Sequence, residues 1–488
     1  MKGTDILFIN PCAKLQVFQE LSYDFVAIEP PIWISFLAGY MRYKGFSVEV
    51  IDLNVEQLSE KELIFRITEI NPVLAAVIVY GSQPSASTQN MVAAGSLCKL
   101  IKENTNAKVA IGGLHPSALP RKTMEEEEVD FVIEGEGFIT LELLTSCLKA
   151  GANNYSNIPG LWYRDGKSIC SNHRAPNVQE LDYYTAHNCW DLLPMDRYRA
   201  HLWHCFTHVD KVKPYGVIYT SLGCPFSCSF CCINAPFGKP GIRYRSPAIV
   251  LQEIELLAHK YNIFNLKIAD ELFVYDRMHY IPILQGLIER NLNLNIWAYS
   301  RIDTIDIRTL QIMKKAGINW LALGIESANP GVRNASKKKL QFNDIKRIIN
   351  SIREEGIYVI ANYVFGLPYD NMQTMNETLE FAMDLNTEFA NFYCAMAYPG
   401  SKLYNKAISN GWQPPENWLA FSQHSYETVP MGTQFLSPKE VLAFRDQAFQ
   451  KYFSSENYLS MIELKFGNKV RKVIERLLTI KLRRKLLE

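Results

Sequence analysis

Two parts of the chain alternate short apolar runs with longer amphipathic stretches. In residues 1–150 the short runs are rich in Val, Ile and Ala, and the stretches between them have helical periodicity. Because parallel strands need crossover connections, this alternation predicts a doubly wound parallel sheet. The expected strands are 6–9, 48–53, 75–80, 109–113 and 130–133, and the expected helices are 34–43, 61–70, 88–103, 124–127 and 140–149.

Residues 216–430 show the same alternation, and six strand–helix units predict a partial or full barrel. Residues 151–215 contain an Asp165-Gly166 turn between apolar runs, which predicts a hairpin within a connector. Residues 431–488 read as helical. The predicted domains are therefore 1–150, 151–215, 216–430 and 431–488. Barrel strands are expected at 217–221, 265–269, 295–299, 320–324, 358–365 and 391–395, with helices at 247–261, 277–290, 307–316, 342–355 and 372–385.

Four loops that follow strands of the first sheet are rich in glycine and polar residues. Ligands of such sheets bind beyond the carboxyl ends of the strands, and glycine permits a close approach of the backbone. Any one of these loops could be only a tight turn, but four on one edge favour a ligand site. The loops are Asn10-Pro11, Gly81-Ser82-Gln83-Pro84, 112–117 and 134–137.

Composition narrows the class of protein. The 488 residues are 48% hydrophobic and carry 51 basic and 50 acidic side chains, a formal charge of +1, which is typical of a globular protein and does not favour nucleic-acid binding. No uncharged apolar run reaches the roughly 18 residues of a membrane span, and the start does not resemble a signal peptide. The 11 cysteines without a secretion signal favour a reducing cytoplasm and a metal or redox use of some thiols.

Two clusters of charged or metal-binding side chains leave alternatives open. Residues 465–488 hold nine Lys or Arg and two Glu, with apolar positions at helical spacing, so this helix either contacts an anionic membrane surface or is a solvated terminal helix. His187, His201, His204 and His208 either bind zinc or pack in the connector. Only His204 and His208 share a helical face, and no third ligand follows.

The most informative stretch places Cys224, Cys228 and Cys231 on one loop directly after a strand. Thiolates are soft ligands that suit iron–sulfur clusters, and three of them can bind three irons of a 4Fe–4S cube and leave the fourth open. A zinc ribbon would need a second cysteine pair, which the sequence lacks. Cys232 adjoins the third ligand and is interpreted as a packing residue.

This loop resembles the motif of radical S-adenosylmethionine (SAM) enzymes, and the resemblance implies a (β/α)6 partial TIM barrel. It also implies that Phe230 packs against adenine, that Asp270 or Glu271 meets the SAM amino group, and that further polar contacts follow later strands. A structural salt bridge remains the alternative for Glu326. The implied SAM-binding residues are Phe230, Asp270, Glu271, Arg301, Glu326, Ser327, Tyr363 and Gly366.

Residues 1–150 resemble the cobalamin-binding domains of radical SAM enzymes of the class B type. The segments that carry this resemblance are Pro30-Pro31, 45–52, 112–120 and 134–137. The Asp-x-His-x-x-Gly motif that supplies an axial histidine in other cobalamin proteins is absent. His115 lies outside such a motif, so the lower axial ligand stays open, as does a domain without cobalamin. The implied cobalamin-binding residues are Asn10, Ser82, Gln83, Gly112, Gly113, His115, Pro116, Glu134, Gly135 and Glu136.

The resemblance implies a 4Fe–4S cluster, SAM, cobalamin and an electron donor such as flavodoxin or ferredoxin. The expected reaction is methylation of an unactivated carbon in a small-molecule or lipid-like substrate. Alternatives are a cyclase or rearrangement enzyme without methyl transfer, and an iron–sulfur electron-transfer or binding protein. A methylthiotransferase acting on RNA is disfavoured by the neutral charge. Aromatic residues expected either to line the barrel or to form its core are Trp297, Tyr299, Trp320, Tyr363, Phe392 and Tyr393.

Overall fold

The computed structural model describes residues 3–81, 85–333 and 342–488, and its first layer is a seven-stranded sheet in the order β2-β1-β3-β4-β5-β6-β7. The first five strands are parallel and fully buried along most of their length, as the apolar runs predict. They are β1 (Ile6–Asn10), β2 (Val48–Asp52), β3 (Leu74–Val79), β4 (Lys108–Gly113) and β5 (Phe131–Ile133).

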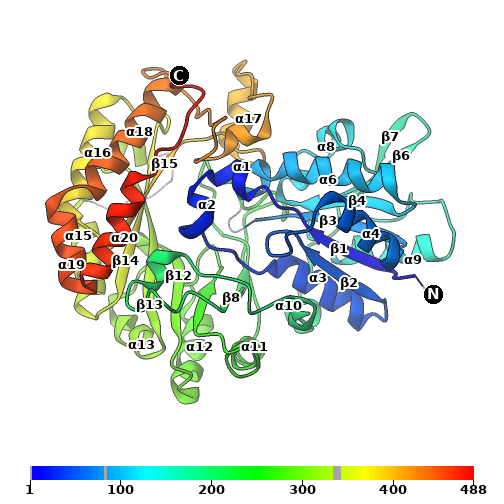
Figure 1. The fold of residues 1–488 in the computed structure, drawn as a ribbon, viewed down its shortest axis with the longest axis horizontal. Coiled ribbons are helices and arrows are strands. Elements are labelled where there is room, and N and C mark those ends of the chain that lie inside the picture. The colour runs from blue at the N-terminus through cyan, green and yellow to red at the C-terminus, as the bar shows by residue number, and fades with distance from the viewer. Residues whose placement is uncertain (1–2, 82–84, 334–341) are drawn as a thin grey trace.

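Helices connect these strands and cover the sheet (Figure 1). The α4 helix begins at a capping box in which Ser59 and Glu62 satisfy each other's backbone amides, and it ends at Asn71 in the left-handed conformation. The helices are α1 (Lys14–Phe18), α2 (Leu21–Asp24), α3 (Ile32–Tyr43), α4 (Glu60–Ile70), α5 (Ala86–Gln89), α6 (Met91–Asn104), α7 (Leu114–Ala118), α8 (Pro120–Glu126) and α9 (Phe138–Lys149).

The predicted hairpin forms, and it extends the first sheet. Strands β6 (Leu161–Asp165) and β7 (Ser168–Ser171) pair antiparallel, and β6 pairs antiparallel with β5. Residues 161–171 therefore belong structurally to the N-terminal sheet rather than to a separate connector. The rest of the connector, including α10 (Leu181–Thr185), packs between the two domains.

The second layer is a parallel sheet of six strands in the sequential order β8-β11-β12-β13-β14-β15. Within the described residues its first and last strands do not pair, so the barrel is open on one side. The strands are β8 (Tyr215–Ile218), β11 (Asn265–Ile268), β12 (Asn295–Arg301), β13 (Ile318–Glu326), β14 (Tyr358–Phe365) and β15 (Phe389–Cys394), and β9 (Ser221–Leu222) pairs antiparallel with β10 (Arg243–Tyr244).

The barrel helices lie outside the strands, and the last three helices pack on the far end of the sheet (Figure 1). This agrees with the predicted helical C-terminal region. The helices are α11 (Pro247–Lys260), α12 (Arg277–Arg290), α13 (Leu310–Lys315), α14 (Pro330–Arg333), α15 (Phe342–Glu354), α16 (Met372–Leu385), α17 (Lys402–Ser409), α18 (Pro438–Phe453), α19 (Glu456–Phe466) and α20 (Asn468–Thr479).

The basic amphipathic helix predicted near the end of the chain is α20. Its apolar residues Val470, Ile474 and Leu477 are buried, because they pack against α18 and α19. This packing leaves no apolar face for a bilayer, so the structure does not support peripheral membrane contact. Within the described part of the chain, no helix combines the length and apolar character that crossing a bilayer requires.

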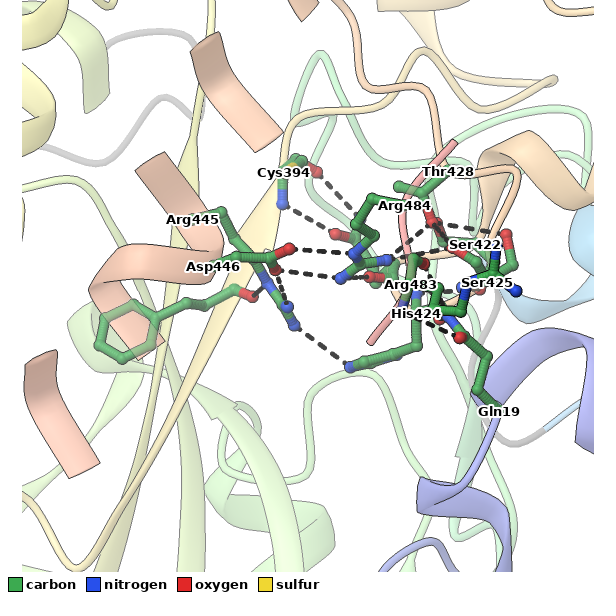
Figure 2. Close-up of polar contacts among 12 residues, drawn as sticks. Gln19, Cys394, Ser422, His424, Ser425, Thr428, Arg445, Asp446, Arg483 and Arg484 are labelled. Atoms are coloured by element: carbon green, nitrogen blue, oxygen red, sulfur yellow. Dashed lines mark hydrogen bonds and ion pairs between the residues drawn. The ribbon is translucent and has the colours of Figure 1, made fainter. Parts of the chain in front are cut away.

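The chain after α20 runs across the open side of the barrel toward α1. Arg484 is 3% exposed and donates to both carboxylate oxygens of Asp446, at 3.0 Å each (Figure 2). Gln19, just after α1, accepts from the Arg483 backbone amide at 3.1 Å. Residues 480–488 thus join the N-terminal domain to the barrel.

Candidate active site

The three cysteines of the predicted cluster lie on one loop between β9 and β10. Gly223 starts this loop with a φ of 89°, and a Cβ there would lie 2.5 Å from the Gly241 carbonyl oxygen, so only glycine fits. The Gly241 amide donates to the Cys224 carbonyl at 3.0 Å, which closes the loop on itself. All three thiols are half-buried, whereas Cys232 is 3% exposed and packs inward as predicted.

Arg301, at the end of β12, reaches this loop. Its Nη1 donates to the Cys228 Sγ at 3.3 Å, and the guanidinium lies 4.0 Å from the centre of the Phe226 ring. Asp303 holds it through two hydrogen bonds of 2.9 and 2.6 Å. A buried cation beside a sulfur favours the thiolate, which is the form that binds iron.

The thiols fit a cluster better than a single metal ion. Among the described residues, no group of three His, Cys, Asp or Glu side chains surrounds one metal position. In a cubane cluster each thiolate binds a different iron, so its three cysteines need not converge on one point. Burial raises the pKa of Cys224 to about 11, so bound iron would have to stabilise its thiolate.

Asp270 and Glu271 differ in what they contact. Asp270 is fully buried and accepts hydrogen bonds from the Thr220 amide at 2.6 Å, the Thr220 hydroxyl at 2.5 Å and the Ser221 hydroxyl at 2.6 Å. Its carboxylate therefore fixes the strand that leads into the cysteine loop. The Glu271 carboxylate has no hydrogen-bond partner among the described residues, and burial raises its pKa to about 8. Glu271 is the carboxylate left to meet an ammonium group.

Glu326 ends β13 in a strained conformation. Its φ is 68°, and the pairing of β13 with β14 shifts register between Gly324 and Glu326. Strain of this kind in a non-glycine residue points to a functional position. Ser327 is fully buried instead, where its hydroxyl lies 3.1 Å from the Thr378 hydroxyl and accepts from the Asn329 amide, so the structure does not bring it to the site.

Tyr363, a predicted SAM contact, lies in the apolar core of the barrel domain. Its ring is fully buried and stacks on Phe392, which in turn contacts Tyr452 of α18. Successive strand residues point to opposite faces, and Tyr363 points to the helix-covered face. Gly366 follows β14 with a φ of 79°, and its amide donates to Asp370 at 3.0 Å. Phe230 is half-buried against an apolar cluster that includes Leu367.

The polar residues predicted at the edge of the first sheet make mostly internal contacts. Asn10 donates to Asp52 at 2.8 Å. His115 is 1% exposed, lies 3.2 Å from the Thr88 hydroxyl and packs edge-on against Trp418, and burial lowers its pKa to about 3. Pro116 is buried beside it. In this structure His115 packs as a neutral ring between Thr88 and Trp418, and its contact with cobalamin stays a prediction.

Glu134 and Glu136, both predicted to contact cobalamin, form ion pairs with arginines. Glu134 accepts from Arg174 at 2.9 Å and from the Trp162 indole at 2.9 Å. Glu136 is 6% exposed and accepts two hydrogen bonds from Arg243, at 2.7 and 3.1 Å. Arg243 follows the cysteine loop, so these pairs fasten the N-terminal sheet to the barrel.

The remaining residues predicted to bind cobalamin are three glycines and two residues that the structure does not describe. Gly112 lies in β4, and Gly113 ends it with a φ of 138°, where a Cβ would lie 2.2 Å from the Val79 carbonyl oxygen. A Cβ on Gly135 would meet only the Pro236 carbonyl oxygen, at 3.7 Å. Ser82 and Gln83 lie outside the described residues.

A small cavity lies between the carboxyl edge of the N-terminal sheet and the barrel, where a corrinoid would bind. It measures about 100 Å³ and is lined by Asn10, Tyr80 and Gly81 on one side and by Tyr219 and Ala269 on the other. The Tyr80 hydroxyl is buried without a hydrogen-bond partner in the described structure. An unpaired donor and a positive-φ glycine suit a ligand at this place. The cavity is smaller than a typical ligand pocket, so the described residues leave room there for only part of a corrinoid.

A second cavity, of about 760 Å³, occupies the barrel interior. Trp297, Tyr299 and Tyr393 line it as predicted, whereas Trp320 and Tyr363 do not. Phe392 also borders it, but from the helix-covered face, where it stacks on Tyr363. Sequence reasoning missed Glu29 and Lys267, whose side chains form a buried ion pair of 2.9 Å that lines both cavities. The only local signal for this pair was the position of Glu29 directly before Pro30-Pro31. Its partner Lys267 lies 238 positions away, and a single sequence does not reveal such a pairing.

The connector histidines pack as the non-metal alternative predicts. His204 is fully buried, with its Nε2 3.1 Å from the Asn295 carbonyl oxygen, and the His208 Nε2 lies 2.9 Å from the Asn265 side chain. His201 accepts from the Ala27 amide at 3.2 Å, and His187 stacks on Tyr43. Each ring therefore has a structural partner other than a metal.

A parallel six-stranded barrel with a three-cysteine loop, joined to a doubly wound sheet, defines a two-domain α/β metalloenzyme. The radical SAM superfamily description matches residues 218–382, and the B12 binding domain description matches residues 24–145. The chain therefore carries a match to the B12 binding domain followed by a match to the radical SAM superfamily, in the order that the sequence motifs predict.

Similar proteins agree with this assignment. An uncharacterized methyltransferase of Pyrococcus horikoshii is 29% identical over 80% of this chain and 82% of its own length. The anaerobic magnesium-protoporphyrin IX monomethyl ester cyclase of Rubrivivax gelatinosus is 27% identical over 88% of this chain and 75% of its own. The structure of the radical SAM methyltransferase TsrM from Kitasatospora setae, with cobalamin and a [4Fe-4S] cluster bound, has a TM-score of 0.67 at 20% identity and covers 83% of this chain and 74% of its own.

Proposed function

We propose that the protein is a cobalamin-dependent radical SAM enzyme that methylates an unactivated carbon of a small molecule. The observation that carries this proposal is the position of the cysteine loop. Three thiols, Arg301 and Glu271 lie at the carboxyl ends of the barrel strands, and Tyr299, two positions before Arg301 on β12, lines a cavity large enough for a small molecule. The matching family descriptions and the named methyltransferase relatives support it.

The residues divide into three roles. Cys224, Cys228 and Cys231 would hold a 4Fe–4S cluster, and Arg301 would stabilise the Cys228 thiolate. Glu271 would bind the SAM ammonium, with Phe230, Glu326 and the backbone near Gly366 as further contacts. When bound, the cluster and SAM supply a radical that removes a hydrogen atom, and cobalamin supplies a methyl group. The barrel walls would orient the substrate carbon and exclude water.

The corrinoid would sit at the edge of the first sheet, near Tyr80, Gly81 and Gly135. The backbone of Gly112 and Gly113 supports this edge, and residues 161–171 extend it. In this division residues 216–430 cleave SAM and residues 1–171 bind the corrinoid. An electron donor such as flavodoxin or ferredoxin would reduce the cluster.

A cyclase is the second candidate. It keeps the same cofactors and omits methyl transfer, and the relative named as a magnesium-protoporphyrin IX monomethyl ester cyclase favours it. The two reactions differ in what remains of SAM, because methyl transfer from SAM leaves S-adenosylhomocysteine. Radical formation alone leaves methionine and 5′-deoxyadenosine.

Product analysis separates these candidates. The protein is reconstituted anaerobically with iron, sulfide and cobalamin, then given SAM and a strong reductant, and the products are measured by mass spectrometry. 5′-Deoxyadenosine together with S-adenosylhomocysteine is the expected result for a methyltransferase. 5′-Deoxyadenosine alone favours the cyclase. The absence of both products, with the cluster intact, would contradict the proposal and leave an electron-transfer or binding protein.

A further inference from the structure

The 760 Å³ cavity is not confined to the barrel interior. Its inner wall includes Tyr299, Ala322 and Ile360 of neighbouring strands, and its outer wall includes Phe25 and Ile480, which lie on the side where β8 and β15 do not pair. Gln450 and Lys481 also line it and are exposed to solvent. One continuous cavity therefore leads from the barrel interior to the protein surface through the open side of the barrel.

The chain around this opening is held by specific contacts. Arg484 donates to Asp446, to the Ser425 carbonyl at 3.1 Å and to the Thr428 hydroxyl at 3.0 Å (Figure 2). Gln19 donates to the His424 carbonyl at 2.6 Å. A buried arginine with several hydrogen bonds fixes residues 480–488 against α18 and α1. The terminal segment that borders the opening is therefore held in one position by hydrogen bonds.

On the other side of the opening, α2 and α20 approach each other. Arg476 of α20 forms an ion pair with Asp24 of α2 at 3.1 Å, and its guanidinium lies 5.0 Å from the centre of the Phe25 ring. The outer wall combines an apolar stretch with the solvent-exposed side chains of Gln450, Lys451 and Lys481. The apolar stretch lies between α2 and the end of α20. It is formed by Leu21, Phe25, Leu477, Ile480 and Leu482. An apolar wall that water can reach favours an apolar ligand, whose burial removes that surface from water.

The charged groups that line the inner part of the cavity are already paired. Lys267 binds Glu29 at 2.9 Å, and Arg445 binds Asp446 at 2.7 Å. Burial lowers the pKa of His201 to about 3, so this histidine adds no charge at neutral pH. A charged ligand group would enter a poorly solvated space without a matching counter-ion, which is unfavourable.

Uncharged hydrogen-bonding groups remain open at the inner end. The Tyr299 and Tyr393 hydroxyls have no hydrogen-bond partner among the described residues, and neither does the side-chain amide of Gln89. Burial, with a smaller contribution from the charge of Glu326, raises the pKa of Tyr393 to about 12. The two hydroxyls therefore stay protonated, can donate to a ligand oxygen, and lie toward the residues proposed to bind SAM.

We propose that the substrate is an elongated, mainly apolar molecule with an uncharged carbonyl or hydroxyl group, and that it enters through this side opening. Its polar group binds the Tyr299 and Tyr393 hydroxyls, and its apolar body extends toward Phe25 and Ile480. This inference rests on the proposed function, because it assumes that the barrel cavity holds the substrate.

A neutral naphthalene ketone, 6-propionyl-2-(dimethylamino)naphthalene, serves as the probe, and its naphthalene carboxylate analogue serves as the charged comparison. Binding to the holoprotein is measured by equilibrium dialysis. We expect the carboxylate to bind at least about tenfold more weakly than the ketone. Val473→Trp narrows the opening from α20, and Ile480→Trp narrows it from the residue that follows α20. Each substitution should weaken ketone binding about tenfold. Tyr393→Phe should weaken it severalfold, about 1 kcal/mol.

Leu464→Trp is the matched control, because Leu464 is 87% exposed on α19 and does not line the cavity. Ketone binding to this variant should equal that of the wild type. Equal binding of the ketone and the carboxylate, or unchanged binding in both opening variants, would overturn the inference. SAM cleavage is measured on the same preparations. If the wild-type protein does not cleave SAM, the proposed function is contradicted. If the wild type cleaves SAM but both opening variants bind the ketone as tightly as the wild type does, only the substrate inference is contradicted.

Discussion

The carboxyl edges of the two parallel sheets use their acidic residues differently. At the edge of the N-terminal sheet, Glu134 and Glu136 bind Arg174 and Arg243, which belong to the connector and the barrel. At the edge of the barrel, Glu271 has no hydrogen-bond partner among the described residues. A motif residue can therefore fasten two domains or face a ligand, and only its contacts distinguish these roles. The predictions below test this difference, from the largest effect to the smallest.

The cysteine loop should respond most strongly. Cys224→Ser, Cys228→Ser and Cys231→Ser each remove one thiolate, so each variant should lose the stable cluster and reductive SAM cleavage should fall to background. Cys232→Ser is the matched control, because this adjacent cysteine packs inward. Iron and sulfide analysis of the reconstituted variants measures the effect. A fully occupied cluster in any of the three variants would contradict the assignment.

The pair Asp270 and Glu271 sharpens the comparison within the barrel. Glu271→Gln should weaken SAM binding at least about tenfold, because an ammonium loses a charge-assisted hydrogen bond, and stability should change little. Asp270→Asn should instead lower the free energy of unfolding by about 2 kcal/mol, because Thr220 and Ser221 lose a shared acceptor. Calorimetric titration with SAM and denaturant unfolding measure the two effects. The opposite pattern would show that Asp270 is the ligand.

Glu136 tests the N-terminal edge. Glu136→Gln breaks a buried ion pair with Arg243 and should destabilise the protein by about 3 kcal/mol. Its affinity for cobalamin should stay at the wild-type value, because the side chain points to an arginine and not to the cavity. Denaturant unfolding and cobalamin titration give both quantities. A large loss of cobalamin affinity at unchanged stability would restore the sequence-based prediction for this residue.

Tyr363 should give the smallest effect. Its hydroxyl is buried without a partner in the described structure, so Tyr363→Phe should leave the free energy of unfolding within about 1 kcal/mol of the wild type. SAM affinity should not change, because the ring packs on the helix-covered face of the barrel. Weaker SAM binding in this variant, measured by the same titration, would show that the side chain contributes to the site.

The sequence predicted the positions of the strands, and it predicts the three cysteines as cluster ligands, because both depend on local patterns. The apolar runs match the buried strands to within a few residues, and the three cysteines share one loop. It did not predict which side of a strand Tyr363 occupies. Strands of a parallel sheet are buried on both faces, so the side chains on the two faces do not alternate in polarity.

Ion pairs between residues far apart in the chain could not be predicted from the sequence either. Glu136 and Arg243 are 107 residues apart, and Glu29 and Lys267 are 238 residues apart, so neither pair leaves a local pattern. The role of the basic α20 helix was undecided for the same reason. Its apolar positions suited either a bilayer or a protein surface, and the structure places α18 and α19 against them.

In the proposed reaction, SAM-derived methyl groups pass through a corrinoid bound to this protein. The most direct test of this transfer uses SAM with a deuterium-labelled methyl group and the anaerobically reconstituted protein with reduced cobalamin. The corrinoid is then extracted and its mass measured. We predict a corrinoid that carries the labelled methyl group, in amounts that depend on the protein. A corrinoid without label, while 5′-deoxyadenosine accumulates, would contradict methyl transfer.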